Sequence, residues 1–236
     1  SYYKGICVFS DFLNLNEQSI FLSMKSELPA IQYDFFGGFP DAERKMLCFC
    51  GNDRITAEKE KLFPITCIRI SPENKKFSDS LTHRDFLGAI LHLGIDRSKL
   101  GDILIKEKEG CLFCTSSIHT FIMEQLIKVK HTMVNTAVIE QEDFQYEPAL
   151  KEITGTVSSV RLDSILSVAF QSSRSSMTSL IKGGKVYVNS REVVSNSYVL
   201  KDHDVVSVRG YGKFIYTGTS YQTKKGRYSV KVLLYT

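Results

Sequence analysis

The chain has 236 residues and a net charge of +4, with 43% hydrophobic and 24% charged residues, a composition typical of a globular protein with a buried core. No apolar stretch approaches the roughly 18 residues needed to span a membrane, and residues 1–10 lack the basic and apolar regions of an export signal. We therefore expect a cytoplasmic protein with no membrane contact.

Residues 1–62 predict a small α/β region. Alternating apolar residues indicate strands over 4–10, 32–36 and 46–50, and the last two are expected to pair around a Gly-Gly-Phe-Pro segment. Residues 16–28 have helical spacing. The inner face of this helix is predicted to consist of Ile20, Phe21, Met24 and Leu28.

Residues 63–147 alternate between strand and helix patterns. Two amphipathic segments predict helices over 85–93 and 116–130, the second with a Ser N-cap. Strands are predicted over residues 65–70, 102–106, 110–115 and 135–140. The resulting order, βαββαβ, is the ferredoxin-like or RRM-like arrangement.

Residues 148–236 predict two short helices followed by strands. The first helix carries Leu162, Ile165, Leu166 and Ala169 on one face. The second begins after Ser173 as N-cap and ends at Gly184. Strands are predicted over 185–189, 205–209, 214–217 and 228–234, the last two in an extra hairpin or small sheet. The predicted fold class is therefore α+β.

An acidic segment over residues 140–148, ending in Pro148, separates two parts of opposite charge. Residues 1–150 contain 17 basic and 21 acidic residues (net −4), whereas residues 151–236 contain 13 basic and 5 acidic residues (net +8). We place domain boundaries to give residues 1–62, 63–147 and 148–236. The basic third domain predicts an anionic partner, with nucleic acid favoured over a merely solvated charged face.

The C-terminal residues also form an ordered series of motifs. They read Arg161-Leu-Asp163-x-x-Leu166, Ser173-Arg174-Ser175, Leu180-Ile181-x-x-Gly184-x-Val186-x-Val188-Asn189, Asp204-x-Val206-x-Val208 and Arg209-Gly210-x-Gly212-Lys213-Phe214. Over about 55 residues this series resembles the S4 domain, an RNA-binding module of ribosomal proteins and of some synthetase tails. The resemblance implies that the chain binds structured RNA.

The S4 resemblance also implies which residues contact RNA. Arg side chains grip phosphate with two parallel hydrogen bonds, and helix N-termini with Ser hydroxyls bind phosphate. The implied contact residues are Arg161, Ser173, Arg174, Ser175, Lys182, Lys185, Asn189, Arg209 and Lys213. Asp163 is instead expected to order the first helical turn together with a nearby Arg.

The rest of the chain resembles YlmH-type proteins, in which an N-terminal α/β region and an RRM-like domain precede an S4 domain. The matching motifs are Gly37-Gly38-Phe39-Pro40-x-Ala42-Glu43-Arg44-Lys45, His83-Arg84-Asp85-Phe86-Leu87-Gly88-Ala89-x-Leu91-x-Leu93-Gly94 and Arg97-x-x-x-Gly101-Asp102-Ile103. The resemblance implies rRNA and tRNA ligands, the ribosomal large subunit of bacteria, rescue of stalled translation complexes, and a link to cell division.

A second RNA-contacting patch is an open alternative on the acidic body. Arg84, Arg97 and Lys99 are its candidate residues. RRM-like sheets stack bases on aromatic side chains of their central strands. Here residues 110–114 offer only Phe113, so we expect the RRM-like domain to act as a scaffold or protein-contact element.

The cysteines are expected to be reduced core residues, as is usual in cytoplasmic proteins. They are Cys7, Cys48, Cys50, Cys67, Cys111 and Cys114. A zinc site is the alternative. However, residues 111 and 114 differ by an odd number and would face opposite sides of a strand. We therefore expect no metal and no cofactor.

These patterns predict a non-enzymatic RNA-binding protein with no small-molecule substrate. One alternative is an RNA-modifying enzyme with an S4 targeting domain, such as a pseudouridine synthase. The Gly-Arg-Leu-Asp motif of that class is incomplete, because Val160 precedes Arg161 and the motif lies within the S4 pattern. A cell-division-associated scaffold is the other alternative.

Overall fold

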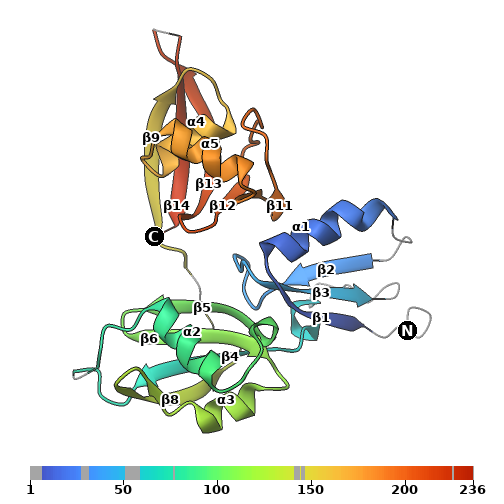
Figure 1. Cartoon of the computed structure of the whole chain (residues 1–236), viewed down its shortest axis with the longest axis vertical. Coiled ribbons are helices and arrows are strands. Elements are labelled where there is room, and N and C mark those ends of the chain that lie inside the picture. Colours follow the sequence, from blue (N-terminus) through green and yellow to red (C-terminus); the bar gives the residue numbers. More distant parts are fainter. Residues whose placement is uncertain are drawn as a thin grey trace. The chain divides into compact units, whose positions relative to one another are not determined.

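The structure is a computed structural model, and it describes residues 7–27, 32–50, 59–76, 78–140, 144, 147–224 and 226–235. The chain divides into two units (Figure 1): residues 1–14 with 24–146, and residues 15–23 with 147–236. The predicted α+β class is confirmed, since three antiparallel sheets are combined with helices. None of the helices in the described ranges is long and apolar enough to cross a membrane.

The first unit begins with a three-stranded antiparallel sheet in the order β1-β3-β2. Its strands are β1 (Val8–Leu13), β2 (Gln32–Phe36) and β3 (Lys45–Cys50). The second and third predicted strands are confirmed, and the predicted pairing of β2 with β3 places Phe36 opposite Met46. The first strand extends further along the chain than predicted, and the early part of its predicted range, residues 4–6, lies outside the described residues.

The expectation that every cysteine is reduced is wrong for two of them, because Cys7 and Cys50 form a disulfide bond. The antiparallel pairing of β1 with β3 sets Val8 opposite Phe49. Cys7, which precedes Val8, and Cys50, which follows Phe49, are thereby brought to a Cα–Cα distance of 4.3 Å. This distance suits a disulfide between neighbouring strands. Cys48, Cys67, Cys111 and Cys114 are free thiols, as predicted.

Helix α1 (Leu15–Met24) differs from its prediction. Ile20 and Met24, expected to face inward, are 50% and 47% exposed, whereas the polar Gln18 is buried. Leu28, the last residue of the predicted face, lies outside the described residues. Most of the helix belongs to the second unit, where the Ser19 hydroxyl accepts a hydrogen bond from the Glu192 N–H. Two of the four residues of the predicted inner face are therefore exposed.

The RRM-like arrangement predicted for the middle of the chain is present as a five-stranded antiparallel sheet in the order β5-β6-β4-β8-β7. Its helices are α2 (His83–His92) and α3 (His119–Gln125), with 3-10 turns at Lys59–Leu62 and Arg97–Lys99; a further 3-10 turn, Lys25–Glu27, follows α1 near the N-terminus. Its strands are β4 (Ile65–Pro72), β5 (Leu100–Lys106), β6 (Glu109–Thr115), β7 (Lys128–Val129) and β8 (Thr132–Ile139). Both helices cover one face, where Ile68, Phe86 and Ile122 share a core.

Helix α3 is shorter than the predicted helix over 116–130. It starts after Ile118, not after a Ser N-cap, and no side-chain cap bond forms there. Beyond Leu126 the chain instead forms a hairpin in which Lys128 pairs with Met133 and Val129 with Thr132. Because β-branched residues such as Val129 favour strands, this local pairing ends the helix early.

The face of the five-stranded sheet opposite α2 and α3 is also buried. Phe113 of β6 is 2% exposed, and its ring lies 5.0 Å from the rings of both Phe39 and Phe144. Residues of the N-terminal sheet and of the five-stranded sheet share this core, which we call the aromatic layer; it includes Phe12, Phe36, Phe39, Phe63, Cys67 and Phe113. Phe113 is therefore a core residue and is not free to stack on a base.

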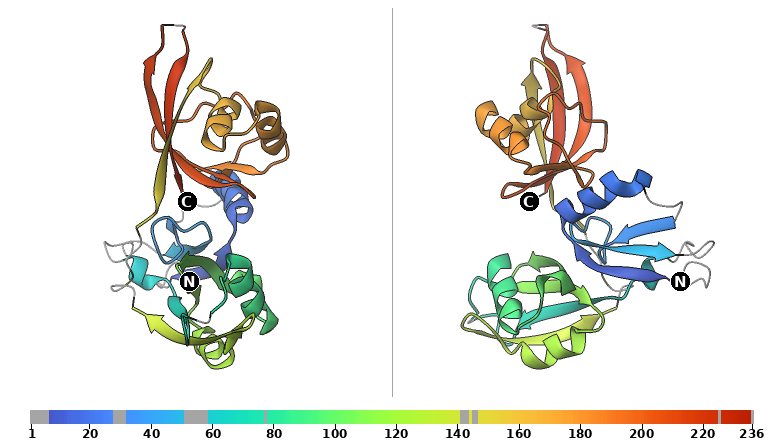
Figure 2. Two further views of the ribbon diagram at one scale, coloured as in Figure 1. Left: turned by 90° about the vertical axis from the view of Figure 1, so that its left-hand side faces the viewer. Right: turned by 45° about the vertical axis from the view of Figure 1, so that its right-hand side comes forward.

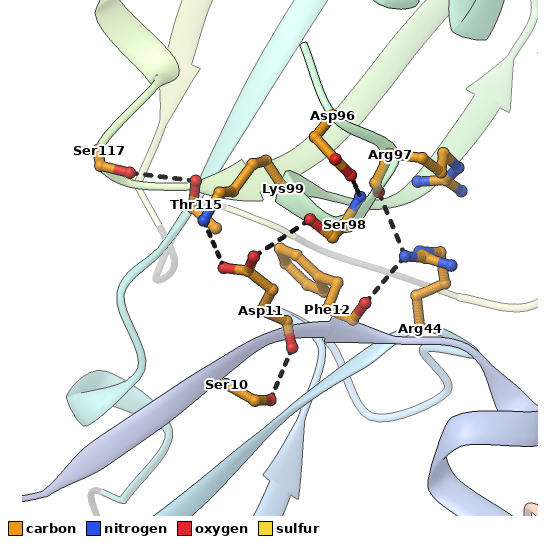
Figure 3. A network of polar contacts seen from close by, with 10 residues as sticks. All are labelled: Ser10, Asp11, Phe12, Arg44, Asp96, Arg97, Ser98, Lys99, Thr115 and Ser117. Atoms are coloured by element: carbon orange, nitrogen blue, oxygen red, sulfur yellow. Dashed lines mark hydrogen bonds and ion pairs between the residues drawn. The ribbon is translucent and has the colours of Figure 1, made fainter.

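Polar contacts join the same two sheets beside the aromatic layer (Figure 3). The Arg44 guanidinium donates to the carbonyl oxygens of Phe12 (2.9 Å) and Leu100 (2.8 Å). Asp11 accepts from the Lys99 ammonium at 2.7 Å and from the Ser98 hydroxyl at 3.1 Å. The Arg44 bonds satisfy carbonyl oxygens of two buried residues, whereas the side chains of the Asp11–Lys99 pair are both 40% exposed.

The second unit is a six-stranded antiparallel sheet, order β11-β10-β12-β13-β14-β9, with two helices on one face (Figure 2). The helices are α4 (Leu162–Ala169) and α5 (Arg174–Lys182). The strands are β9 (Leu150–Val157), β10 (Val186–Val188), β11 (Arg191–Glu192), β12 (Val205–Val208), β13 (Gly212–Gln222) and β14 (Tyr228–Tyr235). The predicted helices, strands and hairpin are all found.

Strand β9 was not predicted. All eight of its residues pair with β14, from Leu150 opposite Tyr235 to Val157 opposite Tyr228. Gly155 interrupts its apolar pattern, which weakens the strand signal. The structure explains this glycine, because a Cβ atom at that position would lie 2.7 Å from a methyl group of Val168 on α4.

Candidate nucleic-acid interface

The two helices of the second unit are held by their apolar faces. Leu162, Leu166 and Met177 are fully buried against the sheet. The Ser173 hydroxyl caps α5 by accepting a hydrogen bond from the Ser176 N–H at 3.2 Å, as predicted. Gly184 follows α5 with a φ of 64°, a left-handed conformation that suits glycine after a helix end. Both helices thus have fixed orientations. Helix α5 presents an exposed face to solvent, whereas no residue of α4 is exposed and its N-cap, Arg161, carries the exposed side chain.

An ion-pair cluster connects the beginnings of α4 and α5. Asp163 is 5% exposed and accepts from the guanidinium of Arg174 at 2.7 Å and from that of Arg161 at 3.3 Å. Burial alone would raise the pKa of Asp163. The hydrogen bond and charge of Arg174, with those of Arg161, outweigh burial and hold the pKa below its ordinary value. This agrees with the ordering role predicted for Asp163.

The arginines of this cluster still face solvent. The side chains of Arg161 and Arg174 are 44% and 50% exposed. Asp163 therefore fixes one side of each guanidinium and leaves the remaining N–H groups available to an external acceptor, since a guanidinium has five such donors. A pair of arginines preset in this way suits the oxygens of phosphate.

The exposed side of α5 continues this basic surface. It carries hydroxyls and a terminal lysine and has no acidic residue; over residues 161–185 the chain has four basic residues against the single, neutralised Asp163. We call the combined region the α4–α5 surface, formed by Arg161, Ser173, Arg174, Ser175, Ser179 and Lys182, all of them exposed. Ser179 was missed from the sequence, although its spacing of four from Ser175 places both on one helical face.

Lys185 and Arg209 form a neighbouring pair. The Arg209 N–H donates to the Lys185 carbonyl oxygen at 2.9 Å, and both side chains are exposed. Their positions follow from the register of β10 and β12, which sets Val186 opposite Val208. These two residues add positive charge beyond the C-terminal end of α5.

Two other residues implied by the S4 resemblance lie elsewhere. The Asn189 amide donates to the Asp204 carboxylate at 2.7 Å, and its oxygen accepts from the Val205 N–H. With a φ of 49° it occupies the turn between β10 and β11. Lys213 neighbours the buried Phe214 on β13 and so faces the side of the sheet away from α4 and α5, with its ammonium over the Tyr235 ring at 4.2 Å. Neither belongs to the α4–α5 surface.

The three residues of the second candidate patch have different surroundings. The Arg97 guanidinium donates to the carbonyl oxygens of Leu100 and Gly101, and burial and the nearby charge of Arg44 lower the pKa of Arg97 to about 10. Lys99 pairs with Asp11. Arg84 lines a groove beside α2. The second patch stays a prediction, with Arg97 and Lys99 already engaged by oxygen atoms of the protein.

The cysteines offer a further cluster, in which the sulfur atoms of Cys7, Cys48 and Cys50 lie within 4.8 Å of one another. Two of these sulfurs are joined in the disulfide, which leaves one thiol as a ligand. Cys111 and Cys114 lie on opposite faces of the five-stranded sheet, as their odd spacing predicted, in the aromatic layer and in the helix-covered core respectively. Cys111 and Cys114 therefore do not point toward a common ligand position.

Comparisons with known proteins match both units. Residues 59–143 match the family described as "Putative RNA-binding domain in YlmH", and residues 160–206 match the "S4 domain". The chain is 31% identical over 225 residues to the "Ribosome-associated protein quality control protein P2" of Bacillus subtilis (strain 168), covering 94% of this chain and 84% of that protein. The solved structure of "Cell division protein ylmH from Streptococcus pneumoniae" aligns with a TM-score of 0.47 at 19% identity, over 58% of this chain and 81% of that one.

Proposed function

The chain belongs to the YlmH family of RNA-binding proteins with an S4 domain, and on this basis we propose that it is a non-enzymatic factor that grips the phosphate backbone of structured RNA through the α4–α5 surface. The observation that carries the proposal is the ion-pair cluster. It holds two half-exposed arginines, Arg161 and Arg174, at the starts of two helices by means of one buried carboxylate. Backbone contacts of this kind position a protein on RNA without reading its sequence.

The RNA is proposed to be ribosomal RNA, tRNA or both, bound on the large ribosomal subunit in the cytoplasm. The name of the Bacillus subtilis relative, a ribosome-associated quality control protein, supports a role in translation quality control or the rescue of stalled complexes. Crosslinking the protein to RNA in cells and sequencing the fragments tests this. Reads from large-subunit rRNA or tRNA are expected, whereas reads confined to messenger RNA would contradict the proposal.

The non-enzymatic assignment rests on the site itself. Asp163, the acid of the Arg-Leu-Asp segment, is 5% exposed and already bound by two arginines. A carboxylate so engaged is not positioned to attack a base. In a strain that lacks the protein, mapping of rRNA and tRNA modifications should reveal no lost site. Loss of a single modified nucleotide would support the enzyme alternative instead.

The α4–α5 surface is tested by comparing two kinds of variant. One kind removes positive charge from the side of the sheet that carries α4 and α5, and the other removes it from the opposite side. The full-length Arg174→Ala/Lys182→Ala variant should bind labelled total tRNA and large-subunit rRNA about tenfold more weakly, and the slope of log affinity against log salt should become shallower by about two, since each lost phosphate contact removes roughly one unit. The loss should be similar for unrelated RNA sequences.

One control and a second test variant accompany it. The control, Lys213→Ala/Lys231→Ala, removes the same charge from the other face of the sheet and should change neither affinity nor slope. The second test variant, Lys182→Ala/Lys185→Ala, removes one lysine of the surface and the neighbouring Lys185. It spares the ion-pair cluster, so it reports on RNA binding even if Arg174→Ala disturbs folding. Equal affinity and slope in both test variants and in the unaltered protein would refute the proposed surface.

A further inference from the structure

A groove in the first unit lies between α2 and the segment that leads from α3 into β7. It is open to solvent and has a volume of about 520 Å³. Arg84, Lys128 and Lys130 are among its lining residues, and the single acidic residue there, Asp85, is paired with Lys130 at 3.0 Å. The lining therefore carries a net charge of +2 in a part of the chain that is otherwise acidic.

Part of the groove lining is apolar. Ile127 contributes a side chain that is 62% exposed, and Leu93 and Leu126 also line the groove, together with the polar His92 and Gln125. Apolar side chains next to unpaired cations provide one surface for a base and another for a phosphate, the combination that single-stranded nucleic acid presents. Among the described residues, Arg84 and Lys128 form no ion pair with an acidic side chain.

Gly88 of α2 also lines the groove, and the fold does not require a glycine there. It lies in the interior of the helix, where glycine is about 1 kcal/mol less favourable than alanine. A Cβ atom at Gly88 would meet no atom within 4 Å, so neither close packing nor a left-handed backbone accounts for it. Its effect is to leave the helix backbone open to a flat group entering the groove.

The aromatic side chain on the central strands of this sheet is not accessible to a base. In RRM-like domains bases stack on aromatic side chains of the central strands, but here Phe113 is 2% exposed within the aromatic layer. An RNA contact made by the matched residues 59–143 therefore does not use Phe113 as a stacking platform.

We propose that the groove binds one unpaired nucleotide of RNA, with its base against Gly88 and Ile127 and its phosphate held by Arg84 and Lys128. This inference rests on the proposed RNA-binding function and adds a second contact to it. The S4 domain grips the backbone of structured RNA, and the groove takes a nucleotide that is not base-paired. The sequence did not reveal the groove. Lys128 was expected to lie within a helix over residues 116–130, but α3 ends at Gln125, and Lys128 in the following segment lines the groove together with Arg84.

The test uses the full-length protein and a fluorescent 12-nucleotide oligouridine. Gly88→Leu extends a side chain into the groove from a position where an added Cβ atom meets nothing within 4 Å, and leucine favours the helix. Its affinity for oligouridine should fall about tenfold, within the range for losing one stacked base, with no fall in Tm. Lys128→Ala should weaken binding as well, whereas Lys106→Ala, which removes an exposed charge from the edge strand β5, should not.

A 4-thiouridine version of the same oligonucleotide locates the contact. Ultraviolet crosslinks in the unaltered protein should map by mass spectrometry to peptides from α2 or from residues 125–130, and should disappear in Gly88→Leu. Unchanged affinity and crosslinking in that variant would overturn the groove. The α4–α5 variants lose affinity for structured RNA whether or not the groove binds, so failure of the groove is distinguishable from failure of the proposed function.

Discussion

Replacing Asp163 with Asn tests the ion-pair cluster more sharply than removing either arginine. The carboxylate is buried and accepts a short bond from Arg174 at 2.7 Å and a longer one from Arg161 at 3.3 Å. A hydrogen bond to a charged group contributes about 1.5–3 kcal/mol, but both guanidinium groups are about half exposed and partly screened by water. We therefore expect Asp163→Asn to lower the free energy of unfolding of the second unit by about 2 kcal/mol.

The expected dependence on pH has a definite sign. Because the pKa of Asp163 is depressed in the folded protein, its contribution is complete above the unfolded value of about 3.9 and is lost as the pH falls through the lower, folded value. The difference in stability between the unaltered protein and Asp163→Asn should therefore be full at pH 7 and should shrink below about pH 4.

Urea unfolding is the appropriate assay. The chain contains no tryptophan, so unfolding is followed by circular dichroism and by hydrogen exchange of peptides from α4 and α5. Asp202→Asn, at an exposed acidic residue of the same unit, is the matched control and should leave stability unchanged. If Asp163→Asn proved as stable as this control, the cluster would not hold the two helices.

The same variant separates stability from RNA binding. Asp163→Asn removes a negative charge from the α4–α5 surface, so affinity for tRNA should change by less than about threefold and the salt dependence should not become shallower. This is the opposite of the result expected for Arg174→Ala/Lys182→Ala. A tenfold loss of affinity in a folded Asp163→Asn protein would contradict this expectation, because it would show that presetting of the arginines by the carboxylate outweighs the removal of its negative charge.

Two further outcomes are expected for the first unit. Phe113→Ala should lower its free energy of unfolding by about 3–5 kcal/mol through loss of a fully buried ring, whereas Phe121→Ala, at a ring that is 46% exposed, should have a much smaller effect in the same urea assay. Iodoacetamide applied to the unfolded, unreduced protein should modify four of the six cysteines, and modification of all six would contradict the disulfide. Reduction of the disulfide should lower the free energy of unfolding by about 4 kcal/mol, since the bond joins residues 43 apart.

Features that depend on local spacing were predictable from the sequence. The inner faces of α4 and α5 follow from apolar residues three and four positions apart, and the Ser173 cap and Gly184 stop mark the bounds of α5. The role of Asp163 was predictable for a similar reason, because an acid in the first turn of a helix is stabilised there.

Features that depend on pairing between distant segments were not predictable. The disulfide requires the register of β1 against β3, and no local pattern in the sequence encodes that register. The basic surfaces show the same limit. In the sequence, Arg97 and Arg84 are equally good candidates for an RNA contact. In the structure, the Arg97 guanidinium donates to backbone carbonyl oxygens, whereas Arg84 lines the groove. Which cations remain available is decided by the carbonyl and carboxylate oxygens that the fold brings to them.

The aromatic layer determines which fragments of this protein can be studied in isolation. The match to the RNA-binding family begins at residue 59, but Phe12, Phe36 and Phe39 come from residues before it. A fragment that starts at residue 59 would expose Phe113 and Cys67 as an apolar patch prone to aggregation. The N-terminal sheet thus covers, from within the same chain, the face of the five-stranded sheet on which bases stack in RRM-like domains.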